Sequence, residues 1–172
     1  QVNFIDSIKF NLDKKINVIH NLGPKILHIS NFNEKNNHRL FNISIASKLT
    51  NGFIRNNCDV INFSYRNFSN KKIFSNVNEA ILDISNNYKP DMLLLGHNNI
   101  LKRNTLEKIN SDKTKISLWY EDHLAYKGPN WKNNLALIEK NNDFIDNYFI
   151  TTHPDVVKTK INKKKISFMP IP

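Results

Sequence analysis

Glu121, Asp122 and His123 place two carboxylates and one imidazole next to one another in the chain. They directly follow residues 116–120, an apolar and aromatic run with the composition of a β-strand. A carboxylate beside an imidazole suits general-base chemistry near neutral pH, because the pKa of an ordinary histidine lies close to that range. We therefore interpret Glu121, Asp122 and His123 as candidate catalytic residues.

Other polar side chains directly follow other β-like runs of the sequence. The carboxyl ends of parallel strands share one edge of their sheet, and open α/β sheets bind their ligands at that edge. We expect the side chains at these positions to line a substrate pocket together with the catalytic candidates. They are Asn31, Asn33, His38 and Arg39 after the first run, His97 and Asn98 after the third, and His153 after the fifth.

Three histidines also have a purely structural interpretation. His153 precedes Pro154 and can simply cap a helix. His97 follows Gly96 at the expected end of a strand, where a turn requires polar residues in any case. His28 lies inside the first β-like run, and we expect it to belong to the core.

The sequence lacks the motifs of several classes of ligand site. No G-x-G-x-x-G follows the first β-like run, and no P-loop pattern occurs anywhere in the chain, which contains only four glycines. The histidine and paired-acid spacings of metal sites and the G-x-S-x-G of hydrolases are also absent from the sequence. We therefore expect this domain to bind no metal and no nicotinamide or ATP cofactor.

Six short β-like runs alternate with helical patterns from Lys25 onward. The run at 92–96 is apolar on both faces, which is typical of a parallel strand covered by helices on both sides. The alternation predicts an α/β domain over residues 25–172, a doubly wound, Rossmann-like parallel sheet of about six strands. The expected strands are 26–30, 60–63, 92–96, 116–120, 148–151 and 166–169.

The helical patterns are amphipathic. Residues 40–53 carry apolar side chains three or four positions apart, the spacing of a helix with one buried face. Asn76 and Asn104 each precede a glutamate by three positions, which predicts two capping boxes at helix starts. Residues 1–24 lie outside the strand–helix alternation, and their apolar residues fit one face of a leading helix packed on the domain.

The net charge of +10 raises the question of nucleic-acid binding. Nearly all of the positive charge is lysine spread along the chain, with one dense run at 163–165. A nucleic-acid site would show clustered arginine interleaved with aromatic residues. We therefore interpret the charge as a solvated surface and expect no nucleic-acid partner. A face that attracts an anionic membrane or a phosphate-bearing substrate stays open.

Three features that the sequence lacks bear on the location of the protein in the cell. No apolar run approaches the roughly 18 residues that a membrane-spanning helix requires. The first residues do not form the apolar core of a signal peptide. Cys58 is the single cysteine, so no disulfide can form within the chain. Together they favour a cytoplasmic location, with peripheral membrane contact left open.

Three segments of the chain resemble the amino-terminal domain of GT-B glycosyltransferases. They are residues 25–30, 48–57 and 59–64. The resemblance is to bacterial family 1/family 4-like and spore-maturation CgeB-like proteins, in which a helix ending in G-F-x-R-x-G-H-x-V leads into the second strand. Asn57-Cys58 replaces the usual Gly-His here. Residues 168–172 resemble the point where such chains cross into their second domain.

The resemblance implies a division of labour between two domains. The amino-terminal domain binds the acceptor, and a carboxyl-terminal domain absent from this chain binds the nucleotide-sugar donor, usually without a metal. It implies that Asp122 or His123 removes the proton of the acceptor hydroxyl, while the edge residues named above bind the acceptor, which is a sugar, a lipid or a protein. This fragment alone would then be inactive or nearly so.

A stand-alone flavodoxin-like binding or regulatory module without catalytic activity is the alternative. A receiver domain would need a cluster of acids after the first strand, and Asn31, Asn33 and Glu34 supply only one. A further α/β domain encoded after Pro172 would favour the transferase, and a stop codon would favour the module.

Overall fold

The structure is a computed structural model, and it describes residues 23–32, 44–65, 77–97, 100–109 and 113–170. The leading helix predicted for residues 1–24 lies outside this part of the chain except for Gly23 and Pro24. Asn76, one of the two predicted capping residues, lies outside it as well.

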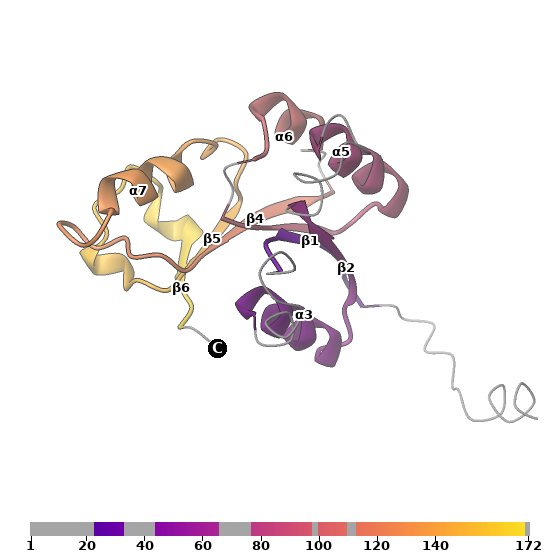
Figure 1. The fold of residues 1–172 in the computed structure, drawn as a ribbon, viewed down its shortest axis with the longest axis horizontal. Coiled ribbons are helices and arrows are strands. Elements are labelled where there is room, and N and C mark those ends of the chain that lie inside the picture. The colour runs from indigo at the N-terminus through magenta and orange to yellow at the C-terminus, as the bar shows by residue number, and fades with distance from the viewer. Residues whose placement is uncertain (1–22, 33–43, 66–76, 98–99, 110–112, 171–172) are drawn as a thin grey trace, which may run out of the picture.

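The described residues form a six-stranded sheet in which every pair of neighbouring strands is parallel. The prediction of a Rossmann-like parallel sheet is therefore confirmed. The strand order is β2-β1-β3-β4-β5-β6 (Figure 1). The strands are β1 (Lys25–Ser30), β2 (Asp59–Ser64), β3 (Met92–Gly96), β4 (Lys115–Tyr120), β5 (Asn147–Ile150) and β6 (Ile166–Phe168).

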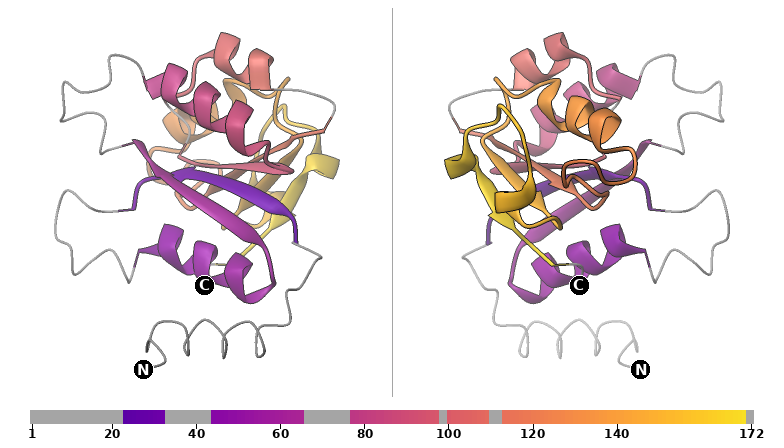
Figure 2. Two further views of the ribbon diagram at one scale, coloured as in Figure 1. Left: turned by 90° about the vertical axis from the view of Figure 1, so that its right-hand side faces the viewer. Right: turned by 90° about the vertical axis from the view of Figure 1, so that its left-hand side faces the viewer.

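Helices cover both faces of the sheet unequally. Among the helices of the described residues, Figure 2 shows α3 on one face and α5 with α6 on the other. The side chains of α7 join the same hydrophobic cluster as those of α5 and α6. The α-helices of the described residues are α3 (Ile45–Arg55), α5 (Val77–Tyr88), α6 (Arg103–Ile109) and α7 (Trp131–Glu139), and the short 3-10 turns are η1 (Pro154–Val156) and η2 (Lys163–Lys165). None of the helices in the described residues is long and apolar enough to cross a membrane.

The unequal cover follows from the direction in which the chain moves across the sheet. From β1 the chain steps outward to β2, and from β2 it returns past β1 to β3 and continues in that direction. Because crossovers between parallel strands are right-handed, this reversal places the first connecting helix on one face and the later ones on the opposite face.

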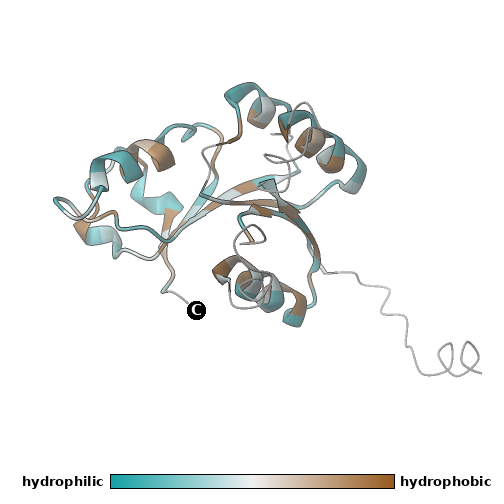
Figure 3. Cartoon of the chain, in the orientation of Figure 1, coloured by the Kyte–Doolittle hydropathy of each residue, from teal (hydrophilic) through white to brown (hydrophobic). Residues whose placement is uncertain are grey.

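The core consists of two apolar layers separated by the sheet. Leu93 and Leu95 of β3 pack with Ile81 of α5 in the larger layer, each no more than 1% exposed. Leu94, between them in sequence, points to the other face and packs with Trp119. Burial on both faces explains why residues 92–96 are continuously apolar, and each buried leucine stabilises the fold by about 1.5–3 kcal/mol. Figure 3 shows hydrophobic stretches in the sheet and hydrophobic as well as hydrophilic segments along the helices.

Two helix starts are fixed by side chains of polar residues. The Ser44 hydroxyl accepts a hydrogen bond of 3.1 Å from the Ser47 amide at the start of α3. At the start of α6 the structure differs from the capping box predicted at Asn104, which lies inside the first turn. Asn78 of α5 supplies the cap instead, and its side-chain oxygen accepts a hydrogen bond of 2.9 Å from the Lys102 amide.

Candidate functional site

The strand order reverses at the carboxyl ends of β1 and β3, and a small crevice there is lined by Ile29, Gly96 and His97 among other residues. The chain leaves these two neighbouring strands in opposite directions, and open α/β sheets bind ligands at such a reversal point. Asn31 follows β1 and His97 follows β3, so the structure places these two predicted residues at the crevice. Gly96 allows the close approach of the two strands, because a side-chain carbon there would collide with the Ser30 hydroxyl.

His97 meets the two carboxylates that follow β4. Its Nε2 lies 3.0 Å from Oε1 of Glu121, within hydrogen-bond distance, and its Nδ1 lies 3.7 Å from Oδ2 of Asp122. The side chains of His97 and Glu121 are each 29% exposed, and that of Asp122 is 52% exposed. The closer contact therefore orients the ring on Glu121, while the carboxylate of Asp122 stays accessible to a substrate.

The backbone of His97 has an unusual conformation. Its φ is 49°, in the left-handed region that residues other than glycine rarely adopt. Non-glycine residues in such conformations persist where surrounding contacts hold them, and they cluster at functional sites. Here the ring contacts with Glu121 and with the aromatic residues of β4 hold the turn.

Two aromatic residues of β4 lie near the His97 ring, Tyr120 from the larger core layer and Trp119 from the smaller one on the other face of the sheet. The ring centroid of His97 lies 5.0 Å from that of Tyr120 and 6.3 Å from that of Trp119. Burial raises the pKa of the Tyr120 phenol well above its ordinary value, and the negative charge of Asp122 raises it further. Tyr120 therefore remains a neutral phenol beside the Asp122 carboxylate at neutral pH.

Three buried polar atoms of this cluster lack a hydrogen-bond partner within the described part of the chain. They are Oε2 of Glu121, Nε1 of Trp119 and the hydroxyl oxygen of Tyr120. Because nearly all buried polar atoms in proteins are paired with protein or water, each marks a position where an ordered water or a polar group of a ligand would gain a hydrogen bond.

Side chains of the residues directly after β5 and of α7 fix the loop that carries the two acids. The Thr151 hydroxyl donates a hydrogen bond of 2.8 Å to the backbone oxygen of Glu121. The Leu124 amide donates one of 3.1 Å to the Thr152 hydroxyl. The side-chain amide of Asn134 donates one of 2.9 Å to the backbone oxygen of His123. The acids are therefore held by neighbouring elements rather than by a free loop.

His123 is not the imidazole that meets these carboxylates. Its side chain is exposed and its ring lies against Gly128, where a side-chain carbon would collide with the ring. Sequence reasoning paired the acids with the adjacent histidine and gave His97 no role in the acid–base group. The signal available for His97 was its position directly after a buried strand.

Of the remaining predicted site residues the structure describes only His153, and it does not bring that residue into the group. His153 is 61% exposed, and its Nδ1 accepts a hydrogen bond of 3.4 Å from the Asp155 amide at the start of η1. This contact corresponds to the structural interpretation of His153 as a helix cap. In the described residues no contact joins His153 to His97. The other four predicted residues lie outside the described residues: Asn33, His38, Arg39 and Asn98.

His28 is fully buried beneath α3, as expected for a core histidine. The Thr50 hydroxyl lies 3.0 Å from His28 Nδ1 and donates its single proton to Oδ1 of Asn62 at 2.8 Å. His28 Nδ1 must therefore carry the hydrogen and donate it to Thr50. Burial lowers the pKa of His28 to about 4, so the ring is neutral at physiological pH.

No group of three or more histidine, cysteine, aspartate or glutamate side chains in the described ranges is arranged to hold a metal ion. The chain matches no model of a known protein family, and no curated protein matches it significantly.

Proposed function

We propose that this chain is the acceptor-binding domain of a glycosyltransferase and that Asp122 accepts the proton of the acceptor hydroxyl. The observation that carries the proposal is the group formed by His97, Glu121 and Asp122 at the reversal point of a parallel α/β sheet. The resemblance of three chain segments to the GT-B amino-terminal domain supplies the reaction type.

In the proposed reaction the acceptor hydroxyl lies in the crevice between β1 and β3. Its proton moves to the carboxylate of Asp122, and its oxygen forms a bond to the anomeric carbon of the donor sugar. The bond from that carbon to the phosphate oxygen breaks, and the electron pair leaves with the nucleotide. The donor is held by another domain, and this domain contributes the base and the acceptor contacts.

Asp122 is favoured over His123 as the base because of its surroundings. Its carboxylate is half-exposed beside His97, whereas the His123 ring lies against Gly128. Glu121 and His97 are positioning residues in this proposal: Glu121 holds the His97 ring through the 3.0 Å contact, and His97 in turn borders Asp122.

The test is a transfer assay on the full-length protein with panels of nucleotide sugars and acceptors. The substitution Asp122→Asn should lower kcat by about 10²–10⁴-fold, which is the usual contribution of a general base. Asp143→Asn is the matched control, because that carboxylate is 68% exposed and pairs with Arg103 instead. Unchanged turnover by Asp122→Asn would remove Asp122 from the mechanism.

The 172-residue chain supplies a second test of the proposal. If the donor site belongs to another domain, this chain alone should not transfer or hydrolyse any nucleotide sugar. Turnover by the purified chain without additional protein would contradict the division into acceptor and donor domains.

A ligand-binding module without catalysis is the second candidate. The order of the first five strands in the sheet, β2-β1-β3-β4-β5, is that of flavodoxin-like domains, which bind ligands at the β1/β3 crevice. In this case the full-length protein would bind a ligand at His97 but convert no nucleotide sugar with any acceptor.

A further inference from the structure

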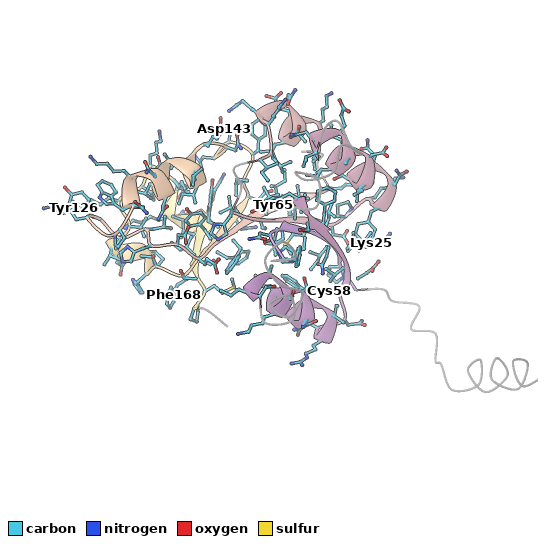
Figure 4. All side chains as sticks on the ribbon, in the orientation of Figure 1. Lys25, Cys58, Tyr65, Tyr126, Asp143 and Phe168 are labelled. Carbon is cyan, nitrogen blue, oxygen red and sulfur yellow. The ribbon has the colours of Figure 1, made fainter. Side chains whose placement is uncertain are left out.

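The loop after β4 and the first residue of α7 form an aromatic pair. Tyr126 is 44% exposed, and its ring lies 5.0 Å from that of the partly buried Trp131 at an angle of 65°. Figure 4 shows Tyr126 at the far end from α3 and α5, projecting from the loop. Val156 is 51% exposed, and its backbone oxygen accepts a hydrogen bond from the Tyr126 amide, so a further apolar side chain borders the pair.

Three lysines surround this aromatic pair. The Nζ atom of Lys158 lies 4.0 Å from the centroid of the Tyr126 ring, and that of Lys127 lies 5.5 Å from the same ring. The Nζ atom of Lys132 lies 5.8 Å from the Trp131 ring. Within the described residues no carboxylate forms an ion pair with any of the three. We call these five residues the aromatic tip: Tyr126, Lys127, Trp131, Lys132 and Lys158.

The backbone of the tip is built at a conformational cost. Lys127 has a φ of 63° and Asn130 a φ of 52°. Both angles lie in the left-handed region, which residues other than glycine rarely adopt. Such strain persists only where surrounding contacts determine the conformation. Packing of Gly128 against His123 and the hydrogen bond to Val156 provide those contacts. The aromatic side chains are therefore presented on a fixed turn.

The chemistry of the tip fits the surface of an anionic lipid bilayer. Tyrosine and tryptophan place an apolar ring and a polar group at the depth of the lipid headgroups. Lysines near an anionic membrane surface add electrostatic attraction. A single-stranded nucleic acid would instead need free aromatic faces for base stacking, and a lysine already lies over the Tyr126 ring.

We propose that the aromatic tip docks this domain on anionic membranes. The proposal is independent of sugar transfer. Because Tyr126 and Lys127 belong to the loop that begins with Glu121 and Asp122, docking would bring that loop toward the headgroups.

The first experiment is co-sedimentation of the 172-residue chain with vesicles of equal parts phosphatidylcholine and phosphatidylglycerol. Binding should require phosphatidylglycerol and weaken with salt. Each lysine near the surface contributes roughly fivefold in affinity, so Lys127→Glu/Lys158→Glu should reduce partitioning by at least about 30-fold. Equal binding to vesicles of phosphatidylcholine alone would overturn the proposal.

The matched control is Lys163→Glu/Lys164→Glu, which changes the net charge by the same amount. These lysines are exposed in η2, directly before the amino end of β6, whereas Lys127 lies in the loop after β4 and Lys158 follows η1. If the tip is the membrane contact, the control should lose far less binding than Lys127→Glu/Lys158→Glu. Attraction by the total charge alone would instead predict equal losses in the two double variants. Equal losses in both double variants would overturn the assignment to the tip.

Tryptophan fluorescence provides a second measurement. Trp119 is 2% exposed and should be insensitive to lipids, whereas Trp131 belongs to the tip. Brominated phosphatidylglycerol should quench Trp131, and Tyr126→Ser should weaken vesicle binding without changing the circular dichroism spectrum. No quenching despite binding would overturn insertion at the tip. Binding of single-stranded poly(dT) but not vesicles, lost in Lys127→Glu/Lys158→Glu, would replace the membrane with a nucleic-acid partner.

Discussion

Nε2 of His97 lies 3.0 Å from Oε1 of Glu121, although the two residues are 24 positions apart and follow different strands. The contact is a product of strand register. Gly96, the last residue of β3, pairs with Trp119, the last residue but one of β4, so His97 comes beside the end of β4 and the acids that follow it. A slip by one residue would turn the side chains of one strand to the other face and separate the imidazole from the carboxylate.

This contact should appear as an energetic coupling between the two side chains. In a double-mutant cycle with His97→Gln and Glu121→Gln, urea unfolding should give a coupling of about 0.5–1 kcal/mol, since both groups are mostly buried but still touch solvent. The His153–Asp155 pair, at 3.6 Å and with side chains 61% and 81% exposed, is the matched control and should show less. Additive effects at His97 and Glu121 would contradict the contact.

Gly96→Ala and Gly52→Ala should have opposite effects on stability. A methyl group at Gly96 would collide with the Ser30 hydroxyl, so we expect a loss of about 1–3 kcal/mol. Gly52 lies inside α3 with no atom near the added carbon, and there alanine should stabilise the helix by about 0.5–1 kcal/mol. Chemical denaturation measures both values. Partial rescue of Gly96→Ala by Ser30→Gly would assign the loss to this collision.

Asn78→Ala should destabilise the protein more than a typical surface substitution. Asn78 accepts hydrogen bonds from the Lys102 amide and the Thr105 hydroxyl, and its removal leaves the start of α6 uncapped at a cost of about 1–2 kcal/mol. Asn87→Ala is the control, because the exposed Asn87 only donates to the Asp83 carbonyl of its own helix. Equal losses in urea titrations of both variants would contradict the role of Asn78.

The stability of the fold should decrease between pH 6.5 and about pH 4. The pKa of His28 is lowered from 6.5 to about 4 by burial, so in this window the unfolded chain binds a proton that the folded chain excludes. The contribution of His28 is fully present above pH 6.5, falls on acidification and levels off below about pH 4. The difference amounts to about 3 kcal/mol in the free energy of unfolding.

The variants His28→Gln and His153→Gln distinguish the contribution of His28 to the pH dependence of stability from that of other titratable groups. Urea unfolding across the pH window should lose much of its slope in His28→Gln, whereas the variant of the exposed His153 should keep it. An unchanged slope in His28→Gln would mean that the buried imidazole does not control the acid sensitivity.

Local sequence patterns predicted the strands of the sheet because the apolar residues of each strand reflect which of its faces are buried. Residues 92–96 are apolar on both faces and form the central strand β3, buried on both sides as expected. The strand order does not follow from such patterns, since either side of β1 could receive β2 without changing any residue. The reversal that locates the crevice therefore required the structure.

The site was predicted at the level of the sheet edge but not of its contacts. His97 and the acids at 121 and 122 follow strands, so their convergence could be expected. The choice of His97 over His123 depends on the left-handed turn at His97 and on Gly128, which no short-range pattern specifies. The cap of α6 by Asn78 likewise joins residues of two helices, and the local capping box at Asn104 could not reveal it.

The strand order also sets how the sheet can assemble during synthesis. From β4 onward, every strand pairs with the strand completed just before it, and only β3 must find a partner, β1, across an intervening strand. The loop-closure entropy of long-range pairing is therefore concentrated in that one early step. Once β2, β1 and β3 have joined on the ribosome, the remaining strands can be added one at a time as they emerge, each with an edge ready to receive it.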